Sequence, residues 1–158
     1  MTADSATAQD ERFMTDALVL AETAARNGEV PVGAVLVFGD ESIAVAANAP
    51  IRLKDPTAHA EVLALRAAGE RLGNYRLPDS TLYVTLEPCP MCAAAMVHAR
   101  VKRLVYGAAD PKTGAAGSVI DLVRDSRLNH QLTVDGGVLA SEAAALLQAF
   151  FRARRESG

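Results

Sequence analysis

The chain has few cysteines and no long apolar run, the features that would indicate a small secreted domain or a membrane protein. Its 158 residues include two cysteines and no tryptophan, and only 4% are aromatic. Two cysteines cannot form the disulfide framework of a small secreted domain. No apolar run approaches the roughly 20 residues that a membrane-spanning helix needs, and residues 1–11 are polar, unlike a signal peptide. We therefore expect a cytoplasmic protein with no membrane segment.

An excess of positive charge is also absent. The formal net charge is −3, which argues against a protein that binds nucleic acid over its whole surface. Any contact with RNA would need a local basic patch. With 50% hydrophobic residues in 158, the chain is long enough for one well-packed domain and short for two. We expect a single domain over residues 10–158 after a flexible tail over residues 1–9.

Helix and strand patterns alternate along the chain. They are indicated by apolar residues at helical spacing and by β-branched runs between turn residues. The order predicts an α/β fold in three layers, with one central mixed five-stranded sheet and helices on both faces. Helices are expected over residues 13–25, 57–72, from 90, over 119–123 and 140–155; strands over 30–38, 42–47, 81–86, 101–106 and 132–134; and loops over 48–54 and 107–117.

The two cysteines lie where a strand is expected to end and a helix to begin. Residues 85–92 read TLEPCPMC, with Cys89 and Cys92 three positions apart. Pro90 suits the first helical position, because its missing N–H has no intrahelical partner there. The positive end of the helix favours thiolate over thiol. Two thiolates at this spacing form half of a tetrahedral zinc site.

A second helix start, upstream, supplies the missing donor. In residues 55–61, DPTAHAE, either Asp55 or Thr57 is expected to cap the helix, which places His59 in its first turn. One histidine and two cysteines give three protein ligands and leave a fourth position open. Because structural zinc sites are closed by four protein ligands, an open site indicates catalysis. His98 and His130 are then expected to have structural roles.

An acidic residue accompanies the expected metal site. Glu61 follows His59 by two positions, and its carboxylate can take a proton from the attacking water and deliver it to a leaving group. H-x-E followed by P-C-x-x-C is typical of zinc-dependent nucleobase deaminases. Taken alone, the cysteine pair could be a redox motif and His59 a helix cap, but the two motifs together favour zinc.

These motifs resemble the cytidine deaminase superfamily and, within it, the bacterial tRNA-specific adenosine deaminases, which make inosine at the wobble position of an arginine tRNA. The resemblance extends from about Glu29 to Arg155. Residues 29–35 (EVPVGAV) and the two metal motifs are shared in part with other deaminases. Residues 110–118 (DPKTGAAGS) and 150–155 (FFRARR) point to the tRNA branch. The resemblance implies a cytidine deaminase-like fold.

The resemblance also implies residue roles and partners. It makes His59, Cys89 and Cys92 the ligands of one Zn²⁺ per subunit, and Glu61 the catalytic proton shuttle. It implies a homodimer whose site is completed near the subunit interface, with a tRNA anticodon stem-loop as substrate. Its expected contacts to the base, the flanking nucleotides and the anticodon loop are Asn48, Asp110, Lys112, Phe151, Arg154 and Arg155.

Several of these roles have simpler alternatives. Asn48 follows a strand, where asparagine is common as a turn residue. The arginines near the C-terminus could complement the dipole of a solvated helix end. Of the adjacent Phe150 and Phe151, one is expected in the core and the other facing a ligand. Ala49 stands where the family commonly has an arginine, which removes one expected nucleic-acid contact and leaves the chemistry intact.

The expected reaction is hydrolytic deamination, with water attacking C6 of adenine. Two rivals remain open. A small-molecule deaminase of guanine, cytosine or a free nucleoside would use the same zinc core. A zinc-stabilised binding module without catalysis would need a closed site, and Glu61 with three ligands argues against it. The loop at residues 112–118 and the C-terminal arginines favour RNA over a small molecule.

Overall fold

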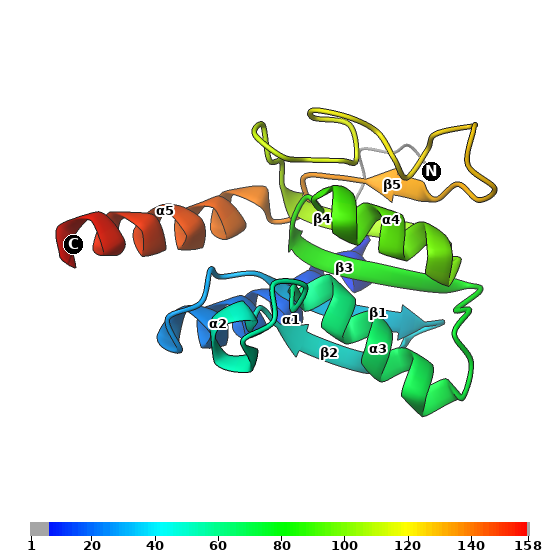
Figure 1. Cartoon of the computed structure of the whole chain (residues 1–158), viewed down its shortest axis with the longest axis horizontal. Coiled ribbons are helices and arrows are strands. Elements are labelled where there is room, and N and C mark those ends of the chain that lie inside the picture. Colours follow the sequence, from blue (N-terminus) through cyan, green and yellow to red (C-terminus); the bar gives the residue numbers. More distant parts are fainter. Residues whose placement is uncertain (1–6, 158) are drawn as a thin grey trace.

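Five strands form one mixed sheet in the order β2-β1-β3-β4-β5 (Figure 1). The structure is a computed structural model that describes residues 7–157. A hairpin pairs β1 with β2, β1 is also antiparallel to β3, and β3, β4 and β5 are mutually parallel neighbours. The predicted mixed five-stranded sheet is confirmed. The strands are β1 (Gly33–Phe38), β2 (Glu41–Ala47), β3 (Ser80–Leu86), β4 (Arg103–Ala108) and β5 (Thr133–Asp135).

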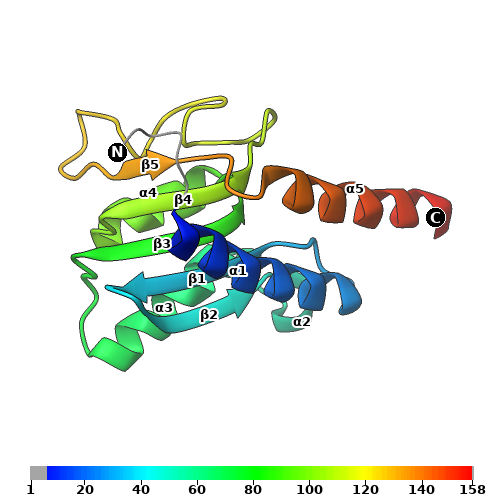
Figure 2. The ribbon, with the colours of Figure 1, turned by 180° about the vertical axis from the view of Figure 1, so that it is seen from behind.

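Helices cover both faces of this sheet, as predicted (Figures 1 and 2). α3 (Ala60–Leu72) and α4 (Pro90–Ala99) lie on one face, and α1 (Ala8–Arg26) lies on the other with the start of α5 (Ala140–Ser157). Successive residues of a strand point to opposite faces. Leu36 therefore packs with the α3 and α4 side, while its neighbours Val35 and Val37 pack against α1.

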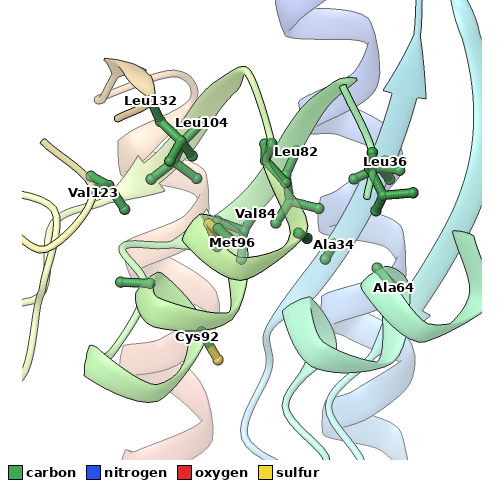
Figure 3. Close-up of a cluster of buried hydrophobic side chains, with 14 of the residues drawn as sticks. Ala34, Leu36, Ala64, Leu82, Val84, Cys92, Met96, Leu104, Val123 and Leu132 are labelled. Atoms are coloured by element: carbon green, nitrogen blue, oxygen red, sulfur yellow. The ribbon is translucent and has the colours of Figure 1, made fainter. Parts of the chain in front are cut away.

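Small and large apolar residues fill the core beneath α3 and α4. Figure 3 shows Met96 of α4 over Leu82, Val84 and Leu104 of the central strands, and Ala64 of α3 over Leu36. Apart from Ala64, these are among the large side chains that are fully buried. The alanines of α3 let its backbone approach the sheet, so both helices lie close enough for their N-termini to meet.

Gly33 sets the fit between α1 and the sheet at the opposite face. A Cβ atom at this position would lie 2.0 Å from the Ala17 carbonyl oxygen and 2.8 Å from the Ala21 backbone nitrogen. No side chain is compatible with that approach, because real Cβ atoms essentially never come within 3.0 Å of such atoms. The glycine of the EVPVGAV segment therefore serves packing.

A buried charge cluster ties α1 to the far end of the sheet. The Asp10 carboxylate accepts hydrogen bonds from both terminal nitrogens of Arg103, each at 2.9 Å, and from the Tyr83 hydroxyl at 2.7 Å. Arg103 also forms an ion pair with Asp135 at 2.9 Å. These bonds join α1, β3, β4 and β5 at the end of the sheet where β3 and β4 begin.

Three local predictions were wrong. α1 begins at Ala8 with a capping box between Thr7 and Asp10, so residues 7–9 are not part of a tail; the other residues of the predicted tail lie outside the described range. Residues 119–123 form no helix; they belong to a loop with one isolated bridge between Ala116 and Asp121. The predicted loop at residues 48–54 contains a one-turn helix, α2 (Pro50–Leu53).

Among the described residues, no helix combines the length and apolar character that crossing a membrane requires.

Candidate active site

The predicted metal ligands meet where β3 ends and two helices begin. Cys89 is the N-cap residue of α4, and Pro90 opens that helix as predicted. His59 is the N-cap residue of α3 and does not lie inside its first turn. The predicted cap was wrong because Asp55 accepts hydrogen bonds from the Thr57 backbone nitrogen and hydroxyl, which forms a turn before the helix.

The three donor atoms are spaced for a metal ion. His59 Nδ1 lies 3.6 Å from Cys89 Sγ and 3.4 Å from Cys92 Sγ. Zinc–sulfur and zinc–nitrogen bonds of about 2.3 and 2.0–2.1 Å at a tetrahedral angle put sulfur and nitrogen about 3.5 Å apart. All three donor atoms lie within 4.8 Å of one another, and within residues 7–157 they form the one such group of histidine, cysteine and acidic side chains. His59, Cys89 and Cys92 therefore fit zinc.

Glu61 lies beside these ligands in a small pocket. The pocket has a volume of about 200 Å³ and is lined by apolar residues together with His59, Glu61 and Cys89. Glu61 itself is only 4% exposed. This volume is below the about 300–1,000 Å³ of drug-sized ligand sites, so the pocket suits one flat ring. Its residues are Val30, Val32, Asn48, His59, Glu61, Leu86, Glu87, Cys89, Asp110 and Thr113.

The protonation states of these groups depend on one another. Burial raises the pKa of Glu61 to about 7, which matches a group that takes and returns a proton near neutral pH. A hydrogen bond from the Cys92 thiol and another from His59 lower the pKa of Cys89 to about 4. The same hydrogen bond to Cys89, with burial, raises the pKa of Cys92. Metal binding must remove the Cys92 proton, so metal uptake depends on pH.

Asn48 reaches the pocket from the end of β2. Its Oδ1 accepts a hydrogen bond of 2.8 Å from the Ala60 backbone nitrogen, which fixes the amide against the start of α3. With Oδ1 turned toward α3, the Nδ2 amino group is available to donate into the pocket. Asn48 thus has the structural role that was its alternative, and it also lines the pocket.

Asp110 lines the same pocket from the loop after β4. Its carboxylate accepts hydrogen bonds from the backbone nitrogens of Lys112 and Thr113, at 3.0 and 3.2 Å, and from the Thr113 hydroxyl at 2.8 Å. These bonds outweigh burial and hold the pKa of Asp110 below its ordinary value. Thr113, to which the sequence assigned no role, completes this side of the pocket.

Four predicted RNA-contact residues lie around a second, shallower hollow. Lys112, Phe151, Arg154 and Arg155 line a space of about 450 Å³ between the loop after β4 and the end of α5. Phe151 is 43% exposed, as expected for the phenylalanine that faces a ligand. The prediction that its neighbour lies in the core was wrong, because Phe150 is only half-buried and its ring packs against Phe151 and the Arg154 guanidinium. Arg154 also donates to the Gly28 carbonyl at 2.8 Å, which holds α5 beside the end of α1. Residues 112 and 151–155 are brought together only by folding.

Sequence reasoning missed two buried carboxylates beside the pocket. Glu29 accepts hydrogen bonds from the backbone nitrogens of Ile51 and Arg52, at 3.1 and 2.8 Å, and so caps α2. Glu87 accepts bonds from the loop that carries Asp110. Glu29 belongs to residues 29–35 and Glu87 to residues 85–92, both of which were noted in the sequence. Each is an acidic residue beside an apolar strand, and because burying an unsatisfied charge is costly, this position could have indicated a hydrogen-bonded carboxylate.

Comparisons with known proteins agree with this geometry. The family model of the cytidine and deoxycytidylate deaminase zinc-binding region matches residues 7–108. The tRNA-specific adenosine deaminase of Haemophilus influenzae is 53% identical over 148 residues, which covers 93% of this chain and 86% of the relative. A match of this length includes the loop after β4 and at least part of α5, beyond the range of the family model.

Solved structures show the same fold. One, from studies of A-to-I editing by tRNA:A34 deaminases at the wobble position of transfer RNA, has a TM-score of 0.84 and 48% identity, covering 86% of this chain and 99% of that one. A guanine deaminase from Nitrosomonas europaea is less similar, at 25% identity and a TM-score of 0.73, covering 89% of this chain and 83% of that one. The chain belongs to the zinc-binding cytidine and deoxycytidylate deaminase family and, within it, to the tRNA-specific adenosine deaminases.

Proposed function

We propose that this protein converts adenosine to inosine at the wobble position of a tRNA anticodon, with an arginine tRNA as its substrate. The observation that carries the proposal is the position of Glu61, buried inside a base-sized pocket against the three zinc ligands. Family membership makes tRNA the macromolecule. A cytoplasmic location, where tRNA is found, is part of the same proposal.

The chemistry follows from the residues that line the pocket. Zinc held by His59, Cys89 and Cys92 would supply a Lewis acid that lowers the pKa of a water molecule. Glu61 takes a proton from that water as it attacks C6 of adenine, and then delivers the proton to the departing amino group, which leaves as ammonia. A pKa near 7 lets the same carboxyl group perform both transfers at neutral pH.

The pocket's size supports a base that is presented by a larger molecule. A volume of about 200 Å³ accepts a flat ring and leaves the sugar and phosphates outside. In an RNA loop the target base is already splayed out, so inserting it costs little. Asn48 Nδ2 donates to an acceptor atom on the base edge, and Val30 and Val32 supply the apolar surface beside the ring.

The nucleotides outside the pocket would lie along the second hollow. Lys112, Arg154 and Arg155 provide positive charge for phosphates there, and the exposed ring of Phe151 provides a stacking surface. The overall net charge of −3 means that binding depends on this patch. The family's usual arginine is replaced by the buried Ala49, 2% exposed, so the loop after β2 adds no charge at that position.

The test compares a macromolecular substrate with small ones. We expect the purified, zinc-loaded protein to form inosine in an anticodon hairpin of arginine tRNA with an adenosine at the wobble position. A hairpin with guanosine at that position is the matched control. Free adenosine, cytidine and guanine should react far more slowly. If free guanine or cytidine reacted faster than the hairpin, the chain would be a small-molecule deaminase and the tRNA proposal would be wrong.

We also propose that the protein is a homodimer through the face formed by α3 and α4. A largely apolar groove of about 900 Å³ lies between these helices, with Tyr75 at its rim 75% exposed. Val62, next to Glu61 in the first turn of α3, lines this groove, so a second copy seated there would reach the start of that helix. We expect light scattering to give twice the chain mass. Tyr75→Glu should shift the protein toward monomer, whereas Val19→Glu, on α1 and 55% exposed, should not.

A further inference from the structure

The loop at residues 110–118 forms a wall between the base pocket and the second hollow. Asp110 and Thr113 face the pocket, and Lys112, between them in sequence, faces the hollow. The path of this loop therefore sets both the shape of the pocket and the position of one phosphate contact. The loop contains no helix or strand of its own, so other parts of the chain must hold it in place.

Glu87 is the side chain that holds this wall. It is 2% exposed and accepts hydrogen bonds from three backbone nitrogens of the loop, those of Asp110, Ala116 and Ser118, each at 3.0 Å. The Ser118 hydroxyl donates a fourth bond to the same carboxylate. One buried carboxylate thus joins both ends of the wall and takes the place of the cross-strand bonds that a hairpin would have.

The loop is shaped around that carboxylate. A Cβ atom at Gly114 would lie 2.4 Å from Cδ and 2.4 Å from Oε2 of Glu87, so a side chain there would displace it. The main chain adds two bonds nearby, from the Glu87 nitrogen to the Ala108 carbonyl at 2.8 Å and from the Ala115 nitrogen to the Pro88 carbonyl at 2.8 Å. Pro88, which directly precedes the zinc ligand Cys89, is therefore hydrogen-bonded to the 110–118 wall.

We propose that Glu87 is a positioning residue for the substrate: its carboxylate fixes the 110–118 wall, and so the fit of the inserted base and the place of Lys112. Glu87 lines the pocket but is not one of the three metal donors, and in this role it acts through the wall. The inference rests on the proposed function for its kinetic consequence. If Glu87 acts through the wall, its loss should raise KM for the hairpin while kcat at saturation and zinc content change little.

Glu87→Gln is the main test, because it keeps the shape of the side chain. In either orientation its amide nitrogen faces donors of the loop, and about half of the four bonds are lost. Hydrogen exchange of the backbone amides of residues 110–118 should become faster. We expect KM for the hairpin to rise about 10- to 100-fold, the range for one lost hydrogen bond to a charged acceptor, because only part of the lost bonding is expressed in substrate binding. We expect kcat to stay within about threefold and zinc content to be full.

Two further variants keep the test decisive if Glu87→Gln folds poorly. Gly114→Ala pushes on the same carboxylate from the loop side and should reproduce the exchange and KM changes. Ser118→Ala removes one bond of four and should give a smaller change in the same direction. Glu29→Gln, the buried carboxylate that caps α2 on the opposite side of the pocket, is the matched control and should leave exchange of residues 110–118 unchanged.

The outcomes are distinct. Unchanged loop exchange and unchanged KM in both Glu87→Gln and Gly114→Ala would overturn the proposal, as would a loss of zinc and kcat at constant KM. If the wild type did not act on the hairpin, the proposed function would fail. The exchange measurement, which needs no substrate, would then still show whether Glu87 holds the wall.

Discussion

The zinc site and the end of α5 differ in burial and in packing against the sheet, which decide how well a protein tolerates substitutions. Cys92 is fully buried and Glu61 is 4% exposed, and both lie on elements packed against the sheet. Residues 151–157 of α5 are all exposed, and this end of the helix projects beyond the sheet (Figure 2). The reaction is thus built into the core, whereas the proposed recognition of RNA uses an exposed extension. Changes at the two places should fail in different ways.

The largest effect is expected at the metal. Cys92→Ala removes a buried zinc ligand, so zinc should be lost and activity should fall by more than about 10³-fold. The free energy of unfolding should also fall, because metal binding contributes to folding. Metal analysis, turnover and chemical denaturation measure these effects. His98→Ala, on the exposed side of the same helix, should keep full zinc content.

A change at Glu61 should separate chemistry from metal binding. Glu61→Gln keeps the shape of the side chain but removes the proton acceptor, so kcat should fall about 10²- to 10⁴-fold. Zinc content and hairpin affinity should match the wild type. Loss of zinc in this variant would show that Glu61 is a metal ligand, contrary to its place outside the set of three donors.

Changes on α5 should weaken binding and spare the chemistry. Arg154→Ala combined with Arg155→Ala should lower hairpin affinity about 10-fold and reduce the slope of log K against log salt by about 1.4, the value for two phosphate contacts on a single strand. Weak activity on free adenosine should persist. Arg12→Ala with Lys102→Ala removes the same charge at the opposite end of the sheet and should leave the slope unchanged. An unchanged slope in the α5 variant would make its arginines a solvated helix end.

The smallest effect on activity is expected at Asp10, where a change should alter stability alone. Burial opposes the ionised form of Asp10, but hydrogen bonds from Arg103 and Tyr83 outweigh it and hold its pKa at about 2, against 3.8 unfolded. The unfolded chain binds more protons between these values, so this stabilisation is complete above pH 3.8 and is lost as pH falls toward about 2. Asp10→Asn should cost about 2 kcal/mol at pH 7, a difference from wild type that disappears in acid. Urea denaturation measures it, and kcat should not change.

The sequence predicted the sheet and the metal donors because both rest on local patterns. Apolar β-branched runs identified all five strands to within about three residues at each end. The zinc ligands were evident because His59 and the cysteines lie at helix starts, and a strand that ends at a helix brings such residues to one edge of a sheet.

The errors came from contacts between residues distant in sequence. α2 exists where a loop was predicted because Glu29, 22 positions before Ile51, accepts its backbone N–H. Residues 119–123 read as helical, but Glu87 captures the backbone nitrogen of Ser118 from 31 positions away and holds the chain in a loop. Neither hydrogen bond can be predicted from the residues next to it in sequence. The exact roles of Asn48, Asp110 and the C-terminal arginines remain predictions.

The two helices that meet at the zinc site begin with residues that do not cap them. Neither His59 nor Cys89 gives its own helix a side-chain hydrogen bond, and a missing N-cap costs a helix about 0.5–2 kcal/mol. The ion that both residues bind therefore fastens the first turns of α3 and α4 to each other. We therefore expect zinc uptake to stabilise the starts of both helices, which would link the folding of this protein to its metal supply.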